Sequence, residues 1–158
     1  MSDWDWKAIL FGFAGRLNRA KFWLVGILLN LVGSFVGNVT LALVEMSGGQ
    51  ADPVFWIGIA ATLILLVAFF WMSFAISVKR LHDRARTGLW LLAFYGLPFA
   101  ALALAMAVPG MDWVVFLIIV IVVIWATVEL GFLKGTTGPN MYGPDPLTVA
   151  PKTTPPVL

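Results

Sequence analysis

The chain of 158 residues has no cysteine, a single histidine and few charged residues. The absence of cysteine excludes disulfide bonds, thiolate metal sites and cysteine nucleophiles, and one histidine, His82, cannot form a histidine metal cluster within one chain. Charged residues make up 11% of the chain, whereas soluble domains carry about a quarter. Most of the surface must therefore face lipid. We expect no metal and no cofactor.

The net charge is only +2, so the chain is not a polycation, and we expect no nucleic-acid partner. Hydrophobic residues make up 61% of the positions, and they gather in four long apolar stretches. Each stretch has about 20 residues, enough for a helix to cross a hydrocarbon core of roughly 30 Å. The predicted spans are residues 22–44, 54–78, 89–108 and 113–133.

The basic residues give the orientation of these spans. The two connections at one end carry only Glu45, Asp52 and Asp112, whereas all ten Lys and Arg residues fall in the N-terminal segment, the central loop and the tail. Positively charged loops stay in the cytoplasm, so both termini and the central loop are predicted to be cytoplasmic. The ten are Lys7, Arg16, Arg19, Lys21, Lys79, Arg80, Arg84, Arg86, Lys134 and Lys152.

The predicted fold is an all-α polytopic membrane four-helix bundle with an amphipathic interfacial helix at the N-terminus. Residues 1–21 mix aromatic and basic side chains, as expected of a short helix in the headgroup region, and Asn18 is placed to cap the first span. Residues 22–133 form the transmembrane domain. Residues 134–158 form a proline-rich cytoplasmic tail, extended or disordered from position 144.

Within the first span, Gly26, Asn30, Gly33 and Gly37 recur at helical spacing. Small residues allow helices to approach closely, and an amide can hydrogen-bond across the interface, so helix packing is the favoured interpretation. The alternative is one polar wall of a path through the membrane. In the third span, Pro98 is expected to kink the helix.

Glu129 is the only formal charge within the four stretches. It lies a few residues before the cytoplasmic end of the last span, at the depth of the central loop. The favoured interpretation is an ion pair with an arginine of that loop, and the alternative is a proton or cation site.

Three cytoplasmic segments carry motifs, with the sequences GRLNRAKFW at 15–23, KRLHD at 79–83 followed by RTGLW at 86–90, and GPNMYGPDP at 138–146. Together these segments resemble the family of domain of unknown function 805, from about residue 13 to residue 146. Lys79, Thr87 and Leu89 depart from the family pattern, which affects fine contacts only. The resemblance implies a small protein of the bacterial inner membrane with this architecture and no assigned biochemical role.

The cytoplasmic segments supply the candidate functional residues. Arginine presents a planar fork suited to phosphate, and these arginines lie at the headgroup level of an anionic leaflet, although setting the topology alone would also require their charge. An acid–base pair of His82 and Asp83 lacks the nucleophile or metal that a hydrolase needs, so no enzyme is predicted. The candidates for binding lipid or a partner are Arg16, Arg19, Arg80, His82, Asp83, Arg84 and Arg86.

The favoured function is that of a non-enzymatic membrane protein whose cytoplasmic face binds anionic lipid headgroups or a cytoplasmic partner protein. The alternative is a small channel or transporter, formed as a homo-oligomer through the first span. A pore is expected to show polar stripes on several spans, whereas only the first span has a strong one.

Overall fold

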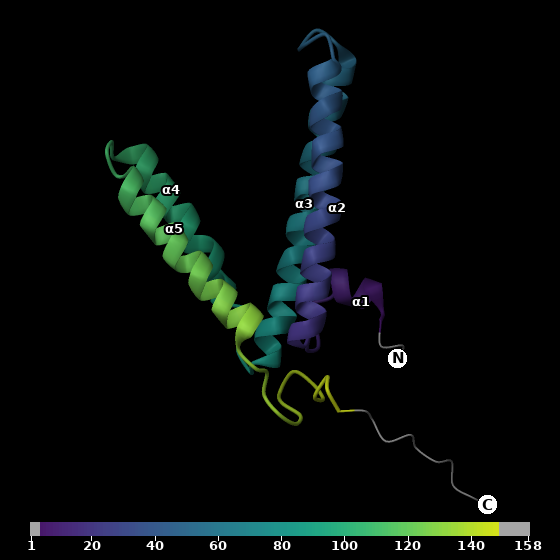
Figure 1. Ribbon diagram of the computed structural model, residues 1–158, viewed down its shortest axis with the longest axis vertical. Coiled ribbons are helices and arrows are strands. Elements are labelled where there is room, and N and C mark those ends of the chain that lie inside the picture. Colours follow the sequence, from purple (N-terminus) through teal and green to yellow (C-terminus); the bar gives the residue numbers. More distant parts are fainter. Residues whose placement is uncertain (1–3, 149–158) are drawn as a thin grey trace, which may run out of the picture.

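The computed structural model describes residues 4–148, which form helices joined by short connections (Figure 1). Within this range there is no strand, only an isolated antiparallel bridge between Asn140 and Gly143. The predicted all-α fold is confirmed. The predicted conformation of 149–158 lies outside the described residues. The helices are α1 (Trp6–Phe11), α2 (Arg19–Met46), α3 (Pro53–Asp83), the π-helical turn η1 (Leu92–Gly96), α4 (Leu97–Ala107), α5 (Asp112–Thr127) and the π-helical turn η2 (Val128–Phe132).

The long helices form two antiparallel hairpins, α2 with α3 and α4 with α5, arranged as a V (Figure 1). The hairpins meet at one end, where η2 packs against α2 and α3. The arms then diverge toward the connections at residues 47–52 and 108–111. The fold is therefore a membrane helical bundle whose two halves join at one end only, because their facing surfaces are mostly apolar and no hydrophobic force drives them together in lipid.

The lengths of the helices agree with a membrane protein. Among residues 4–148, three helices are long and apolar enough to cross a bilayer, namely α2, α3 and the continuous helix 112–132. The predicted third span is shorter than expected, because the apolar helix there is Leu92–Ala107. At 1.5 Å per residue it extends about 24 Å. Its irregular turn, η1, lies just before Pro98, which has no N–H to donate to the carbonyl of Phe94.

Local signals in the sequence explain where the helices begin. Asn18 caps α2 as predicted, since its side chain accepts a hydrogen bond of 2.9 Å from the N–H of Lys21. Asp52 caps α3 in the same way through the N–H of Val54, at 2.8 Å, and Pro53 occupies the first turn. Both caps satisfy an N–H group that has no partner within the helix.

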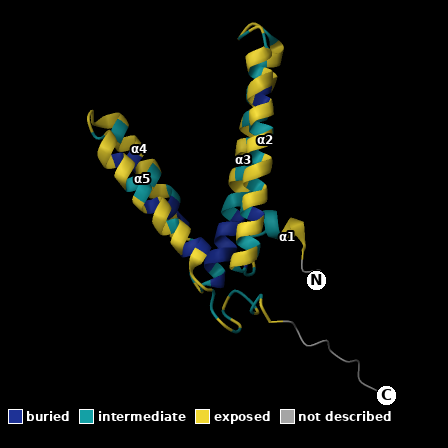
Figure 2. Cartoon of the chain, viewed as in Figure 1, coloured by how far each residue is buried: buried dark blue, intermediate teal, exposed yellow. Residues whose placement is uncertain are grey.

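Buried residues gather where the hairpins meet, whereas the arms are largely exposed (Figure 2). Met46 and Met106, near the tips of the two arms, are 83% and 91% exposed. Such apolar surface would be costly in water but is the normal outer surface of a helix in lipid. The two apolar clusters at the joined end consist of Val78, Leu81, Leu91, Phe94 and Leu130, and of Leu17, Val25 and Ile76.

The short helix α1 projects sideways from the base of the first hairpin (Figure 1). It is fastened by Lys79, whose buried ammonium donates to the carbonyls of Ala8, at 2.5 Å, and Ile9. Trp6 and Phe11 remain half exposed on it. A helix held across the joined end with exposed aromatic side chains has the arrangement expected at a membrane surface.

Candidate functional site

The two hairpins are joined by a buried network of charged side chains, named here the polar junction and comprising Arg16, Arg80, Asp83, Arg84 and Glu129. Arg16 precedes α2, the next three lie at the end of α3, and Glu129 lies in η2. Asp83 and Glu129 each pair with two arginines. Buried charges require such pairing because their transfer out of water is otherwise too costly.

Asp83 is the centre of the first half of the junction. Its Oδ1 accepts a hydrogen bond from Nε of Arg16 at 3.1 Å, and its Oδ2 accepts one from Arg80. The side chains of Arg16 and Arg80 are 1% and 0% exposed, and that of Asp83 is 4% exposed. These two arginines are therefore enclosed within the protein and do not reach its surface.

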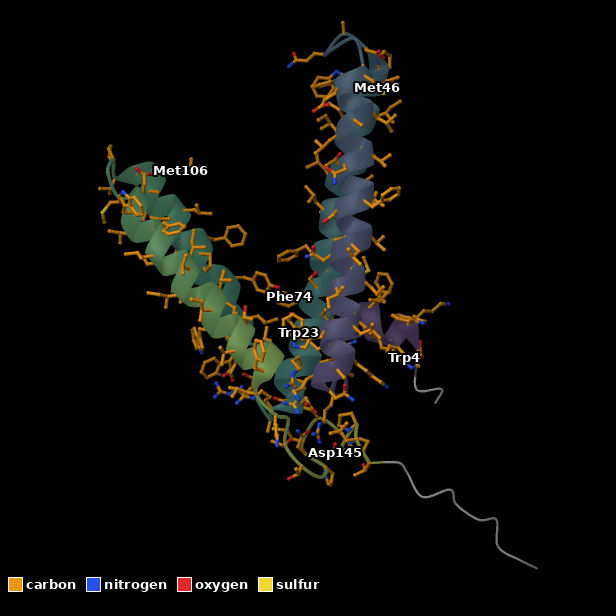
Figure 3. The ribbon with its side chains drawn as sticks, viewed as in Figure 1. Trp4, Trp23, Met46, Phe74, Met106 and Asp145 are labelled. Carbon is orange, nitrogen blue, oxygen red and sulfur yellow. The ribbon has the colours of Figure 1, made fainter. Side chains whose placement is uncertain are left out.

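Side chains from the end of α3 and the start of α2 donate hydrogen bonds to the carbonyl groups at the end of the last helix. The final carbonyls of any helix lack donors within that helix, and side-chain donors can satisfy them. Here indole and guanidinium groups from the first hairpin supply these donors, and Figure 3 shows Trp23 pointing from α2 toward the second hairpin. The bonds run from Arg80 Nε to Leu130 O (2.7 Å), Trp23 Nε1 to Gly131 O (3.0 Å), Arg19 to Phe132 O (3.3 Å) and Arg80 to Leu133 O.

The chain reverses immediately after α3. Ala85 adopts a left-handed conformation with φ of 54°, and the N–H groups of Ala85 and Arg86 donate back to the carbonyls of His82 and Leu81. This is the Schellman pattern of helix termination. It places Arg84 and Arg86 where both can approach η2.

Glu129 forms the second half of the junction. Its Oε1 lies 2.5 Å from Arg84 and 3.0 Å from Nε of Arg86, and its side chain is 6% exposed. These contacts are ion pairs and not aligned hydrogen bonds, since Oε1 has no hydrogen-bond partner among residues 4–148. The arrangement is the one that the ion-pair interpretation requires.

The segment after η2 folds back over the junction. Arg16 donates to the carbonyls of Thr136 (2.5 Å) and Gly138 (2.6 Å), and the N–H of Thr136 donates to the carbonyl of Asp83 (2.8 Å). Gly135 is required here, because a Cβ at this position would lie 2.0 Å from Oδ2 of Asp83. The start of the tail is thus part of the folded protein.

His82 also contacts this segment. Its ring stacks on that of Tyr142, with the ring centroids 3.8 Å apart, and its Nδ1 lies 3.3 Å from the carbonyl oxygen of Gly15. Its own carbonyl accepts a hydrogen bond of 2.9 Å from the side chain of Asn140. His82 is therefore engaged in packing, and both oxygens of the neighbouring Asp83 are engaged by arginines.

Asp145 closes the loop of this segment (Figure 3). The pKa of Asp145 lies below its ordinary value of 3.8 because the N–H groups of Leu147 and Gly138 donate to its carboxylate. A lowered pKa favours the folded loop above pH 4, and this contribution is lost as the pH falls through the lowered pKa.

Three arginines keep part of their surface exposed and are named here the rim arginines: Arg84 of the junction and the remaining predicted arginines, Arg19 and Arg86. Arg19 is exposed, and the side chain of Arg86 is 33% exposed, with its guanidinium 4.2 Å from the centre of the Trp90 ring. Positive charge is in excess at this end, where nine cationic groups and four carboxylates lie among residues 4–148. The cations are Lys7, Arg16, Arg19, Lys21, Lys79, Arg80, Arg84, Arg86 and Lys134, and the carboxylates are Asp5, Asp83, Glu129 and Asp145.

The residues of α2 that were predicted to pack against another helix, Gly26, Asn30, Gly33 and Gly37, do not all face a neighbouring helix closely. A Cβ on Gly33 would contact the ring of Phe69 at 3.4 Å, whereas Cβ atoms on Gly26 and Gly37 would meet nothing within 4 Å. Gly26, Asn30 and Gly33 instead line a hollow of about 240 Å³ between α2 and α3. A role for the whole row in packing stays a prediction.

Sequence reasoning missed several residues of the site. From the sequence, Lys79 is only one of the basic residues, and Trp23, Thr136 and Asn140 have no predicted contact. The turn-dense motif at 138–146 was the available signal. Its partners could not be identified, because the bonds join positions more than 50 residues apart.

All three motifs meet at this end of the molecule: the first supplies Arg16, the second supplies Arg80 and Asp83, and the third contacts Arg16 through the carbonyl of Gly138. The chain matches the family described as "Protein of unknown function (DUF805)" over residues 10–144. It belongs to the DUF805 family. In Escherichia coli (strain K12), the "Uncharacterized protein YiiR" is 32% identical over 139 residues, covering 86% of each chain.

Two further relatives of the chain carry a location in their names. "Inner membrane protein YhaI" is 30% identical over 135 residues, covering 85% of this chain and 86% of its own. "Inner membrane protein YhaH" is 30% identical over 149 residues, covering 91% and 96%. No solved structure matches the chain. Together with the apolar helices, these relatives support a location in a bacterial inner membrane.

Proposed function

We propose that the protein is a non-enzymatic inner-membrane protein that binds the phosphate groups of anionic lipids at its basic end. The observation that carries the proposal is the excess of positive charge around a junction whose own carboxylates are already paired. Anionic headgroups are the counter-charges available at the surface of a bilayer. The groups available to them are the rim arginines Arg19, Arg84 and Arg86, because Arg16 and Arg80 are enclosed.

The geometry of the rim supports phosphate as the ligand. The Arg84 side chain is 16% exposed and that of Arg86 33% exposed, and one oxygen of Glu129 contacts both, so each guanidinium retains N–H groups without a carboxylate partner. Guanidinium groups bind phosphate through paired N–H donors. Trp90, beside Arg86, adds an aromatic anchor of the kind found at membrane surfaces.

Engagement of His82 and Asp83 within the fold supports a non-enzymatic role. The ring of His82 stacks on Tyr142, and Asp83 is neutralised by two arginines, so these neighbours do not form an acid–base pair. A general base must be free to reach the proton that it removes, whereas both groups are engaged by other side chains of the fold.

The proposal places the basic end in the cytoplasm, as the positive-inside rule favours. The fold brings residues 4–21, the central loop and residues 134–148 to this end, and the connections near Gln50 and Met111 to the other (Figure 1). Reporter fusions at Gln50 and Met111 are expected to report the non-cytoplasmic side. A cytoplasmic signal at Gln50 would refute this orientation.

Retention of lipid by the purified protein tests the binding. In native mass spectrometry with equal amounts of phosphatidylglycerol and phosphatidylethanolamine, the wild type is expected to retain the anionic lipid preferentially. The double variant Arg19→Gln/Arg86→Gln should lose most of this preference, because each change removes paired N–H donors to phosphate, worth about 1.5 kcal/mol or more and therefore roughly tenfold in affinity.

The matched control is Lys7→Gln/Lys134→Gln, which removes two charges at the same end of the molecule without touching the rim. It should retain phosphatidylglycerol like the wild type. Equal losses in both double variants would show that charge alone attracts the lipid, and no preference in the wild type would refute the proposal.

A further inference from the structure

Between the hairpins lies a hollow that the polar junction does not use. It has a volume of about 590 Å³ and extends from α3 to Tyr95 in η1. It adjoins the smaller hollow between α2 and α3, since Leu66, Phe69 and Ser73 line both. The ring of Tyr95, which lines the hollow, is 5.9 Å from that of Phe74, which lies between the two arms of the V (Figure 3).

Polar side chains line the two adjoining hollows without using their hydrogen-bonding groups: Asn30 and Ser34 line the smaller hollow, Tyr95 lines the larger one, and Ser73 lines both. The side chains of Asn30, Ser34, Ser73 and Tyr95 have no hydrogen-bond partner within residues 4–148. Three threonines elsewhere on the spans show the usual alternative, because each donates to a carbonyl one turn earlier in its own helix. They are Thr40, Thr62 and Thr127.

These unpaired groups lie too deep for lipid headgroups to satisfy them. Asn30 is 11 residues from the start of α2, and Ser73 is ten residues from the end of α3. At 1.5 Å per residue, both lie about 15 Å from the basic end, inside a hydrocarbon core of roughly 30 Å. A polar group left unpaired at that depth is costly, so an occupant that supplies partners there would be stabilised.

The lining defines the chemistry of the occupant. No lining residue is charged, which favours a neutral molecule. The amide of Asn30 and the hydroxyls of Ser73 and Tyr95 offer donors, which carbonyl oxygens accept. The rings of Phe70 and Tyr95, 5.6 Å apart and edge to face, provide flat apolar walls. The volume of the larger hollow, about 590 Å³, lies within the roughly 300–1,000 Å³ of small-molecule sites. Such sites are likewise mostly apolar with a few polar groups.

We propose that the two adjoining hollows together bind one neutral membrane-soluble molecule of the isoprenoid-quinone class, which carries carbonyl oxygens on a flat ring. Asn30 and Ser73 donate hydrogen bonds to the carbonyl oxygens, and Phe70 and Tyr95 contact the ring. The isoprenoid tail leaves between the arms into the bilayer. The site is separate from the rim arginines, so it stands or falls independently of the proposed lipid binding.

The test uses the purified full-length protein and native mass spectrometry, which counts both bound ligands and protein copies. The probes are decylubiquinone and dodecylbenzene, which has a ring and a tail but no oxygen. The wild type is expected to retain one decylubiquinone per chain and no dodecylbenzene. The variant Asn30→Leu/Ser73→Ala should bind decylubiquinone at least fivefold more weakly, as expected from losing one or two hydrogen bonds.

The matched control is Asn38→Leu, two turns further along α2, because Asn38 already donates to the carbonyl of Ser34, at 2.7 Å. It should bind decylubiquinone like the wild type, with circular dichroism confirming the helix content of all variants. Unchanged binding in the double variant, or none in the wild type, would overturn the proposal. A dimer of the wild type that the Asn30→Leu variant does not form would also overturn the proposal, because the Asn30 amide would then hydrogen-bond to a second copy of the chain.

Discussion

The arginines of the motifs form two groups that differ in their exposure and in their partners. Arg16 and Arg80 are enclosed and bind Asp83 and backbone carbonyls, whereas Arg84 and Arg86 pair with Glu129 and keep part of their surface exposed. The sequence shows that these residues belong together at one membrane surface. It does not show which are enclosed, because that depends on the path of the segment after η2.

The pairing of Glu129 with Arg84 can be measured by a double-mutant cycle. Glu129→Gln should lower the free energy of unfolding in detergent by about 3 kcal/mol, because two guanidinium groups lose their shared counter-charge. Adding Arg84→Gln to that variant should recover part of the loss, with a coupling energy of about 1 kcal/mol or more.

The control for this cycle is Glu45→Gln, which removes a carboxylate at the opposite end of α2. It should change stability by less than about 0.5 kcal/mol, as most surface substitutions do. If the two single changes at Glu129 and Arg84 were additive, the ion pair would contribute nothing. Loss of a proton or cation flux in liposomes by Glu129→Gln, with unchanged stability, would instead favour the transport interpretation.

Among the elements, the helices could be predicted from the sequence and their mutual arrangement could not. Apolar length and caps such as Asn18 locate the long helices. Two features escape that reasoning. The first helix of the second hairpin begins at Leu92, whereas the predicted span begins at residue 89. Both helices of that hairpin contain a π-helical turn. The turn η2 matters most, because its carbonyls are capped by donors from the first hairpin.

Gly131, within η2, tests this docking of one hairpin on the other. A Cβ on Gly131 would lie 2.6 Å from the ring of Trp23, which also donates to the Gly131 carbonyl and packs on Phe132. Gly131→Ala should therefore displace Trp23 and lower the melting temperature in detergent, with a loss of about 1–3 kcal/mol.

The matched control is Gly37→Ala in α2, where a Cβ would meet nothing within 4 Å. That variant should be neutral or slightly stabilised, because alanine is the better helix former. Equal melting temperatures for Gly131→Ala and the wild type would show that Trp23 is free to move and does not hold the hairpins together.

The whole molecule combines one rigidly joined end with two diverging arms (Figure 2). Charged residues concentrate at the joined end, and the arms expose apolar surface to lipid. The membrane location, the helical fold and the gathering of the basic segments at one end all follow from composition and charge. The separation of the two hairpins does not follow from composition and charge. An apolar helix surface in lipid can contact another helix or acyl chains, and the sequence does not distinguish the two.

Contact between lipid phosphorus and individual guanidinium carbons tests the central claim most directly. Solid-state NMR can measure it in bilayers containing phosphatidylglycerol, with arginine labelled at Cζ and signals assigned through single Arg→Lys variants. The account predicts phosphorus-dependent dephasing for Arg19, Arg84 or Arg86 and none for the enclosed Arg16 and Arg80. Dephasing of Arg16 or Arg80, or no dephasing of the three rim arginines, would contradict it.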